Sequence, residues 1–246
     1  MPVVCWDTGI QPPSFFFYEI MRYRIFQDTG VQGKIIDNFF EEPDSIVEMA
    51  NNIGYKKNTA GWWPGSRSNY LHNLYPKLFD SITKKITRLF YDGCLDWSYE
   101  IFFQKINPFT KNQYDKKNCG WIHTDHEYNF GGVIFLNKNP DNDTGINLFK
   151  SKKGYYSITN QEESVKNRHY LVGDVDDEFY EENYNSYHEQ FEETVKIKNI
   201  YNRLVLFDNK TLHAVQTFGM KERLTIPFFN TNIGNEKPPL SFFTKS

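Results

Sequence analysis

The residues best suited to chemistry lie in the segment 119–137, which contains His123 and Asp125. In an extended backbone, side chains two positions apart lie on the same side, so this imidazole and this carboxylate can reach one metal ion. The pair alone is a weak signal, because such pairs arise by chance in a chain with six histidines. Taken alone, the aspartate could equally cap backbone amides in a surface turn.

A second group of suitable residues lies in the segment 203–230. His213 opens a strand-like run, Arg223 follows ten positions later, and Thr225 lies two positions further on the same face. Two imidazoles and one carboxylate form a facial triad that leaves positions on Fe(II) open for a bidentate co-substrate and dioxygen. A guanidinium is a forked, permanently charged partner for the far carboxylate of a dicarboxylate. Taken separately, His213 could be a hydrogen-bonded core histidine and Arg223 a surface charge.

The complete series resembles the Fe(II)/2-oxoglutarate-dependent dioxygenases, on the prolyl-hydroxylase-like branch. The segment TGINLF at 144–149 looks like the Gly-rich strand of that family, and LFDNKTLHAV at 206–215 looks like its approach to the second histidine. Two earlier segments, IIDNFFEEPDSIVEMA and WWPGSRS, resemble the leader of uncharacterised oxygenase-like proteins from viral and bacterial genomes. The resemblance covers residues 35–230.

This resemblance implies a fold, a metal and a co-substrate. The implied fold is a double-stranded β-helix, which is a jelly roll. The implied iron ligands are His123, Asp125 and His213, while Arg223 pairs with 2-oxoglutarate and Thr225 supports it. Such an enzyme uses dioxygen and 2-oxoglutarate and releases succinate, carbon dioxide and a hydroxylated product. The aspartate favours hydroxylation, because halogenating relatives have a small residue at that position.

Other residues near these motifs have more than one interpretation. The family often has a tyrosine on an earlier strand that also contacts 2-oxoglutarate. Here the candidates on that strand are Phe103 and Gln104, and Tyr114 falls in a predicted loop, so that contact stays unassigned. His126 is expected beside the metal site and Cys119 as a small buried residue without a paired base.

The aromatic loop 61–69 also has two interpretations. Trp62, Trp63 and Arg67 could rim a substrate cleft, or their side chains could pack around the Pro-Gly turn between them. In the first case the loop contributes to substrate binding, and in the second it is only structural.

The elements around these residues predict a mainly β fold with N-terminal helices, of the α+β class. Only three alanines occur, against 22 phenylalanines and 16 tyrosines, a composition that favours strands over helices. IIDNFF at 35–40 is predicted as a strand. Helices are predicted after Pro43 and after Pro76, the second ending before Gly93. Short β-type runs follow from residue 97: SYEIFFQKI, GGVIFLN, GINLF, VKIKNI, RLVLFDN, HAVQTF and RLTIPFFN.

The predicted organisation is an N-terminal segment 1–34 of uncertain order and one oxygenase-like domain at 35–246. The domain comprises a helical leader 35–96, a jelly-roll core 97–230 and a tail 231–246, and Met21 is a possible alternative start. Residues 151–199 form an acidic insertion, with eleven acidic and two basic residues between 161 and 193. We expect this insertion to be solvated, with one short helix and with exposed His169 and His188, although a substrate lid or a partner surface is an alternative.

Composition restricts the partners and the compartment. The net charge of −3 argues against binding to nucleic acid, and no apolar run reaches the length of a membrane helix. Three scattered cysteines and a start without secretory features favour the cytoplasm. The excess of Asn, Lys, Ile, Phe and Tyr suggests an A/T-rich genome, such as that of a virus, in which case the cytoplasm would be that of the host. Oligomeric state is not predicted.

The sequence therefore favours an Fe(II)- and 2-oxoglutarate-dependent hydroxylase that acts on a peptide or protein side chain or on a small molecule. Two other classes stay open. One is a non-catalytic jelly-roll binding module with a vestigial metal site, and the other is a cupin-like metal enzyme that does not use 2-oxoglutarate. Arg223 favours the 2-oxoglutarate enzyme over the cupin-like enzyme, because a buried guanidinium without a dicarboxylate would lack its partner.

Overall fold

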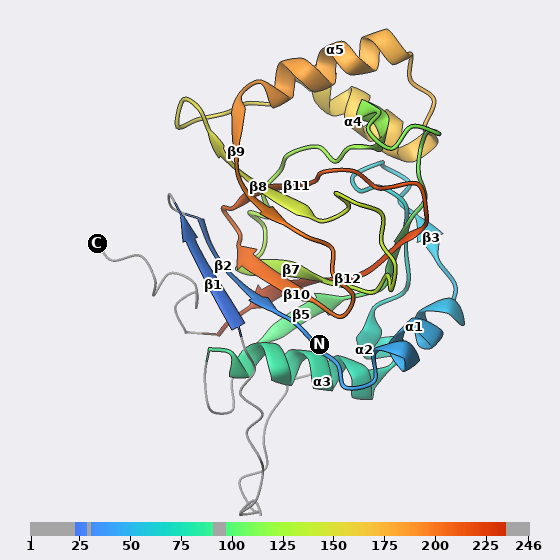
Figure 1. Ribbon diagram of the computed structural model, residues 1–246, viewed down its shortest axis with the longest axis vertical. Helices are drawn as coiled ribbons and strands as arrows, with labels where there is room; N and C mark the ends of the chain where they lie inside the picture. The colour runs from blue at the N-terminus through green and yellow to red at the C-terminus, as the bar shows by residue number, and fades with distance from the viewer. Residues whose placement is uncertain (1–22, 29–30, 91–96, 235–246) are drawn as a thin grey trace, which may run out of the picture.

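The computed structural model describes residues 23–28, 31–90 and 97–234, which form four layers (Figure 1). Helices α1 (Pro43–Asn51), α2 (Leu71–Leu74) and α3 (Pro76–Arg88) form the layer at the bottom of Figure 1. Two antiparallel sheets lie above them. Helices α4 (Asn160–Val172) and α5 (Asp177–His188) form the layer at the top.

The larger sheet has nine strands within the described residues. Their order is β1 (Tyr23–Asp28), β2 (Val31–Ile36), β10 (Leu204–Asp208), β7 (Phe130–Phe135), β12 (Arg223–Asn232), β6 (Gln104–Ile106), β4 (Ser66–Arg67) and β3 (Lys56–Lys57), and β5 (Ser98–Ile101) pairs with β12. The smaller sheet has the order β11 (Leu212–Val215), β8 (Ile146–Ser151) and β9 (Phe191–Ile197). This arrangement of mainly antiparallel sheets with a few helices matches the predicted fold class.

The larger sheet is buried on both faces, and the alternation of side chains along its strands shows how. On β10, Leu204 lies in the cluster shared with the helices, whereas Val205 lies in the cluster between the two sheets. On β7, Ile134 and Val133 divide in the same way. Because successive strand residues face opposite sides, a continuous apolar run can fill two cores at once.

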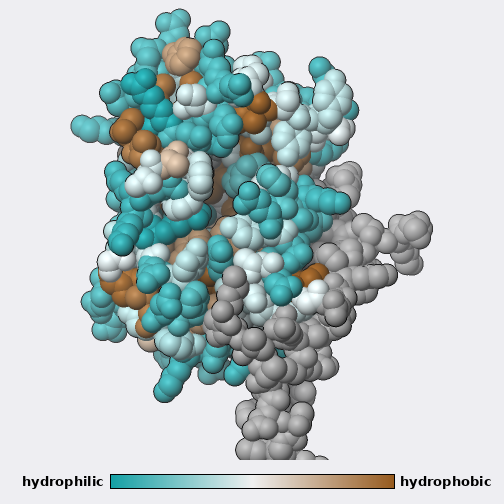
Figure 2. Space-filling model, turned by 180° about the vertical axis from the view of Figure 1, so that it is seen from behind, coloured by the Kyte–Doolittle hydropathy of each residue, from teal (hydrophilic) through white to brown (hydrophobic). Residues whose placement is uncertain are grey.

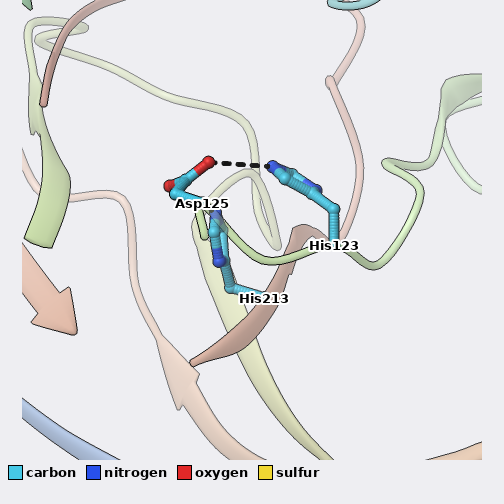
Figure 3. Close-up of side chains that lie close together, drawn as sticks. All are labelled: His123, Asp125 and His213. Atoms are coloured by element: carbon cyan, nitrogen blue, oxygen red, sulfur yellow. Dashed lines mark ion pairs between the residues drawn. The ribbon is translucent and has the colours of Figure 1, made fainter. Parts of the chain in front are cut away.

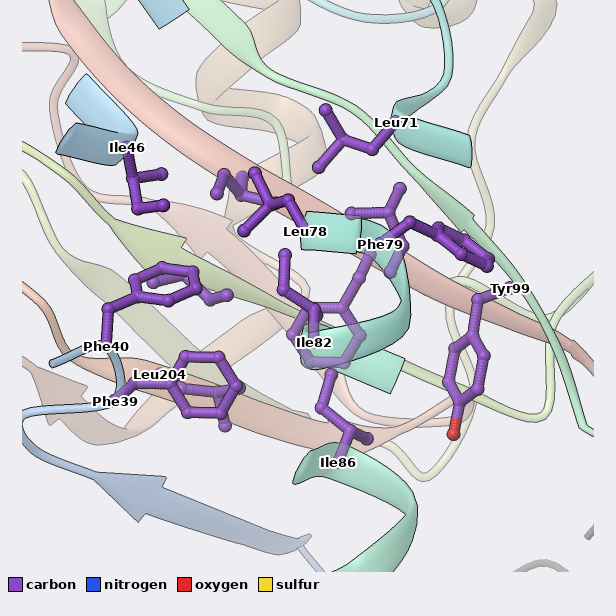
Figure 4. Packing of buried hydrophobic residues seen from close by; sticks show 14 of the residues in the cluster. Phe39, Phe40, Ile46, Leu71, Leu78, Phe79, Ile82, Ile86, Tyr99 and Leu204 are labelled. Atoms are coloured by element: carbon purple, nitrogen blue, oxygen red, sulfur yellow. The ribbon is translucent and has the colours of Figure 1, made fainter. Parts of the chain in front are cut away.

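Helix α3 covers the outer face of the larger sheet, and its start and its buried face agree with the pattern of its sequence. Pro76 is at the start of the helix, where a missing N–H costs nothing. The stripe Leu78, Ile82 and Ile86 is buried and packs in one cluster with Leu204 (Figure 4). The helix ends at Arg88, and Gly93 lies outside the described residues.

Two local predictions need correction. The strand predicted at 35–40 ends at Ile36, because Asn38 takes a left-handed conformation with φ of 55° and turns the chain. Phe39 and Phe40 then enter the core as loop residues. The segment 61–69 is not all loop, because Ser66–Arg67 forms β4.

Part of the N-terminal segment 1–34 belongs to the sheet. Strands β1 and β2 form a hairpin, and β2 pairs with β10. The first residues, with SFFFYEI and Met21, lie outside the described residues. The proposed division of the chain into a leader, a core and a tail stays a prediction.

The acidic segment differs most from the expectation of a solvated insertion with one short helix. It forms two helices, and their inward faces carry Val165, Tyr180, Tyr184 and Tyr187, which are buried against the smaller sheet. His169 is fully buried, and the His188 ring stacks on Tyr184 with centroids 3.8 Å apart, so the prediction that both are exposed is wrong. Most acidic residues lie on the outward faces, which explains why composition alone suggested a solvated segment.

We expect the stability of the protein to fall on acidification because of these two histidines. Burial lowers the pKa of His169 from 6.5 to about 4 and that of His188 to about 3. Between pH 6.5 and about 4 the unfolded chain therefore takes up protons that the folded chain does not, and His169 alone costs about 2 kcal/mol between pH 7 and pH 5. Urea unfolding at the two pH values measures this. His169→Gln should reduce the difference, and an equal difference in His169→Gln and in the natural protein would contradict the assignment.

The surface shows no single broad apolar patch on the face drawn in Figure 2, where hydrophobic residues are scattered among hydrophilic ones. None of the helices in the described part of the chain is both long and apolar enough to cross a membrane.

Candidate metal centre

An antiparallel backbone contact brings the two predicted histidine ligands together. His213 lies on β11, and His123 lies in the extended segment that follows a short 3-10 turn at Lys116–Asn118. His123 N donates to His213 O at 3.0 Å, and His213 N donates to His123 O at 2.9 Å. Side chains of directly paired residues lie on the same side of a sheet, and the two ring centroids are 4.3 Å apart.

Asp125 completes a cluster of three potential metal ligands (Figure 3). One carboxylate oxygen lies 4.0 Å from His123 Nε2 and the other lies 3.5 Å from His213 Nε2. One ligand atom from each residue lies within 4.8 Å of the other two, a spacing that suits a single ion at their centre. The cluster is closed at His213, whose side chain is 9% exposed, and open at His123, whose side chain is 55% exposed.

The hydrogen bonds of both imidazoles favour metal binding through Nε2. His123 Nδ1 lies 2.9 Å from the carbonyl of Trp121, and His213 Nδ1 lies 2.9 Å from the carbonyl of Thr211. A carbonyl can only accept, so each Nδ1 carries the proton and each Nε2 keeps its lone pair.

Helices α4 and α5 hold the segment that leads to His123. Trp121 lies in the middle of their cluster, and the hydroxyl of Tyr187 donates to the carbonyl of Ile122 at 2.9 Å. Three further tyrosines bond to the same segment: Tyr170 accepts from Trp121 N, Tyr180 accepts from Trp121 Nε1, and Tyr184 donates to Gly120 O. The acidic segment therefore positions the first ligand, and the spacing of Tyr180, Tyr184 and Tyr187 along one helix face was the signal in the sequence that could have revealed this role.

Arg223 and Thr225 lie on the inner face of the larger sheet, between the two sheets. Thr225 pairs with Phe135, which lines the core between the sheets, and the Arg223 guanidinium lies 5.5 Å from the centre of the Phe135 ring. Arg223 Nε donates to the carbonyl of Thr144 at 3.2 Å. Within the described residues, Arg223 Nη2 and the Thr225 hydroxyl are buried without a hydrogen-bond partner. Burial lowers the pKa of Arg223 to about 10, so the side chain is still a cation at neutral pH.

The sequence of the chain matches a family model over most of its length. The model of DUF6445, described as a family of unknown function, matches residues 21–219. The chain belongs to this family. No protein with a curated description matches it.

Solved structures share the fold of this DUF6445 protein at low sequence identity. HygX from Streptomyces hygroscopicus, solved with nickel and 2-oxoglutarate bound, superposes with a TM-score of 0.51 at 8% identity and 84% coverage of each chain. The same protein with hygromycin B also bound gives 0.51 at 9% identity, again with 84% coverage of each chain. A prolyl hydroxylase from Trichoplax adhaerens gives 0.46 at 11% identity, covering 80% of this chain and 82% of the other. The likeness to HygX confirms the predicted fold, the jelly roll of the prolyl-hydroxylase-like 2-oxoglutarate oxygenases.

The three residues considered for an additional contact to 2-oxoglutarate lie in different parts of this DUF6445 protein. Phe103 packs in the cluster between the larger sheet and helices α1–α3, on the side of the sheet that faces away from the smaller sheet. Gln104 pairs with Thr225 and therefore faces inward, where its amide donates to the carbonyl of Pro64. Tyr114 is exposed and its hydroxyl bonds to Asp143, so it lies apart from the inner face.

Two further expectations agree with the structure. His126 is exposed and is not one of the three clustered ligands. Cys119 is half-buried, its thiol donates to the carbonyl of Asp115, and burial raises its pKa, which disfavours the reactive thiolate.

Gly131 lies directly behind the metal cluster, and sequence analysis missed it. A Cβ atom at this position would lie 3.5 Å from Asp125 Oδ2 and 3.2 Å from both the carbonyl of Phe228 and the ring of Phe229. We expect Gly131→Val to displace the carboxylate and weaken Fe(II) binding by about 10-fold or more, the scale of changes next to metal ligands. Anaerobic titration with Fe(II) measures the effect. Gly54→Ala is the control because a Cβ there meets nothing within 4 Å, and unchanged affinity in Gly131→Val would contradict the expectation.

Proposed function

We propose that this DUF6445 protein is an Fe(II)- and 2-oxoglutarate-dependent dioxygenase that hydroxylates a peptide or protein side chain or a small molecule, with release of succinate and carbon dioxide. His123 and His213 would hold the iron through Nε2, and Asp125 would hold it through a carboxylate oxygen. Bound iron would supply the activation of dioxygen. Arg223 would pair with the far carboxylate of 2-oxoglutarate, and the Thr225 hydroxyl would donate to it.

The observation that carries this proposal is a pair of buried polar groups, Arg223 Nη2 and the Thr225 hydroxyl, that have no hydrogen-bond partner among the described residues. A buried cation without a counter-ion is costly, so a fold that keeps one has a use for it. The two groups lie on adjacent same-face positions of β12, and a carboxylate can accept from both. A cupin-like enzyme without 2-oxoglutarate, or a vestigial metal site, would have no need of this arrangement.

Aromatic residues beside the metal cluster and beside Arg223 also support 2-oxoglutarate as the co-substrate. The Phe207 ring lies 4.4 Å from that of His213, and Phe135 lies beside Arg223. Both phenylalanines belong to the core between the sheets, so an apolar ring lies beside His213 and another beside Arg223. Apolar neighbours exclude water and strengthen the charge interactions that would orient a dicarboxylate.

The experiment that tests this proposal is anaerobic. Fe(II) and then 2-oxoglutarate are added to the purified protein, and the weak visible charge-transfer band of a chelated iron–keto-acid complex is recorded. We expect the band in the natural protein and not in Asp125→Ala. Iron binding without the band would move the cupin-like enzyme ahead, and a folded protein without iron binding would favour the non-catalytic module.

The proposal also includes the wider expectations from the sequence. Hydroxylation rather than another oxidation, a cytoplasmic location, the absence of a nucleic-acid partner and a viral source are proposals from the sequence. The choice between a peptide and a small molecule depends on the residues that surround the open side of the metal cluster.

A further inference from the structure

Arg67, Arg203 and Arg223 have guanidinium groups largely withdrawn from solvent, and they differ in their partners. Arg203 has a matching carboxylate, since its Nε and Nη2 donate to the two oxygens of Asp37 at 2.5 and 3.0 Å. Arg223 is the one assigned above to 2-oxoglutarate. Arg67, on β4, forms no hydrogen bond or ion pair with any described residue, and its Nε is buried without a partner.

The sheet register places Arg67 on the same inner face as the proposed co-substrate site. Thr225 on β12 pairs with Gln104 on β6, and Gln104 pairs with Arg67 on β4. Directly paired residues of neighbouring strands point to the same side of a sheet, and neighbouring strands lie about 4.8 Å apart. Arg67 therefore lies two strands from Thr225 on the inner face, and among the described strands only the two-residue β3 lies beyond it.

Aromatic rings hold the Arg67 guanidinium in one orientation. Its central carbon lies 3.9 Å from the centre of the Trp63 ring and 4.4 Å from that of Phe102. Ring contacts of this kind occupy the faces of the planar cation and leave its N–H edge for hydrogen bonds. Phe102 also contacts Phe229, which stacks on Tyr128 at 4.6 Å, so the rings form a continuous wall from Arg67 to the turn that carries Asp125.

The charges around Arg67 leave room for an anion. Burial lowers its pKa to about 10, and attraction from Tyr128, Asp125 and Glu100 opposes that decrease, so Arg67 is cationic at neutral pH. Asp125 would be compensated by a bound metal, and Glu100 accepts a hydrogen bond from Tyr128 rather than pairing with Arg67. Acidic groups thus lie near the Arg67 guanidinium, but none of the described residues forms an ion pair or side-chain hydrogen bond with it.

We propose that Arg67 binds a carboxylate of the substrate, so that this protein acts on a carboxylate-bearing molecule or peptide side chain. A carboxylate is planar and can accept two parallel N–H bonds from the free edge of a guanidinium. The aromatic wall between Arg67 and Asp125 would contact the rest of the substrate and direct it toward the metal. That the bound carboxylate belongs to a substrate rests on the proposed function, but binding of an anion to Arg67 can be tested without turnover.

The test follows the Nε–H signals of the arginine side chains and the indole N–H of Trp63 by NMR, in protein with diamagnetic Zn(II). The Arg67 and Arg223 signals are assigned with Arg67→Lys and Arg223→Lys. The protein is first saturated with 2-oxoglutarate and then titrated with propionate, or with propionamide as the neutral isostere. We expect 2-oxoglutarate to shift Arg223, propionate to shift Arg67 and Trp63 with millimolar affinity, propionamide to shift neither, and the paired Arg203 to stay unchanged.

Two variants sharpen the result. Arg67→Gln should abolish the propionate shift of Trp63, and an unchanged Arg203 signal shows that the variant is folded. Glu100→Gln should tighten propionate binding several-fold by removing a nearby like charge. If propionate leaves Arg67 unmoved, or propionamide moves it equally, the carboxylate site is wrong and Arg67 is only a packing residue. If propionate moves Arg67 but 2-oxoglutarate leaves Arg223 unmoved, the anion site stands and the proposed co-substrate fails.

Discussion

Replacing His213 with alanine is expected to lower the affinity for Fe(II) by more than about 100-fold, because even residues that merely orient metal ligands change affinity by about 10- to 100-fold. His213 is the most enclosed of the three ligands, and its Nε2 lies 3.5 Å from Asp125. Competition with a colorimetric chelator under anaerobic conditions measures the affinity. His126→Ala is the matched control, since it removes an exposed imidazole three positions from the first ligand and should bind iron normally. Equal affinity in the two variants would remove His213 from the site.

Replacing Arg223 with alanine is expected to weaken 2-oxoglutarate binding by about 2–5 kcal/mol while iron binding persists. The loss is large because the guanidinium is buried and its Nη2 has no other partner among the described residues. Titration of the iron-loaded protein with 2-oxoglutarate, followed by the charge-transfer band, measures it.

Two companion variants separate charge from geometry at this position. Arg223→Lys keeps the charge but not the fork, so binding should be intermediate. Arg168→Ala removes an exposed arginine on α4 and should bind 2-oxoglutarate normally. If Arg223→Ala binds as well as Arg168→Ala, the co-substrate is held elsewhere or is not 2-oxoglutarate.

Local patterns in the sequence were enough for the elements and for the identity of the candidate ligands. Pro76 and the stripe that follows it predict α3, and each β-type run after residue 97 contains a strand. His123 and Asp125 lie two residues apart in an extended segment, so their proximity is local. The position of His213 beside them is not local, and it was predicted only through the resemblance to a family.

The residues that the sequence did not reveal depend on contacts between distant segments. Gly131 is important because a Cβ there would be confined by Phe228 and Phe229 of the distant strand β12 and would press on Asp125. Arg67 lies on the inner face because of the register of β4 with β6, and both strands are too short to show a clear sequence pattern. His169 looked solvated because its neighbours are acidic, yet its Nε2 lies 2.8 Å from the carbonyl of Lys117 in a buried contact.

The tyrosine contacts of α4 and α5 have a practical consequence for anyone who shortens this protein. An acidic stretch between two strands invites deletion when a smaller domain is wanted for crystallisation or for grafting onto another jelly roll. A version without residues 151–199 would retain all three ligands in its sequence, but it would lose the hydroxyls that fix Trp121 and the backbone before His123. The minimal portable unit of this metal centre is therefore larger than the jelly roll that carries its ligands.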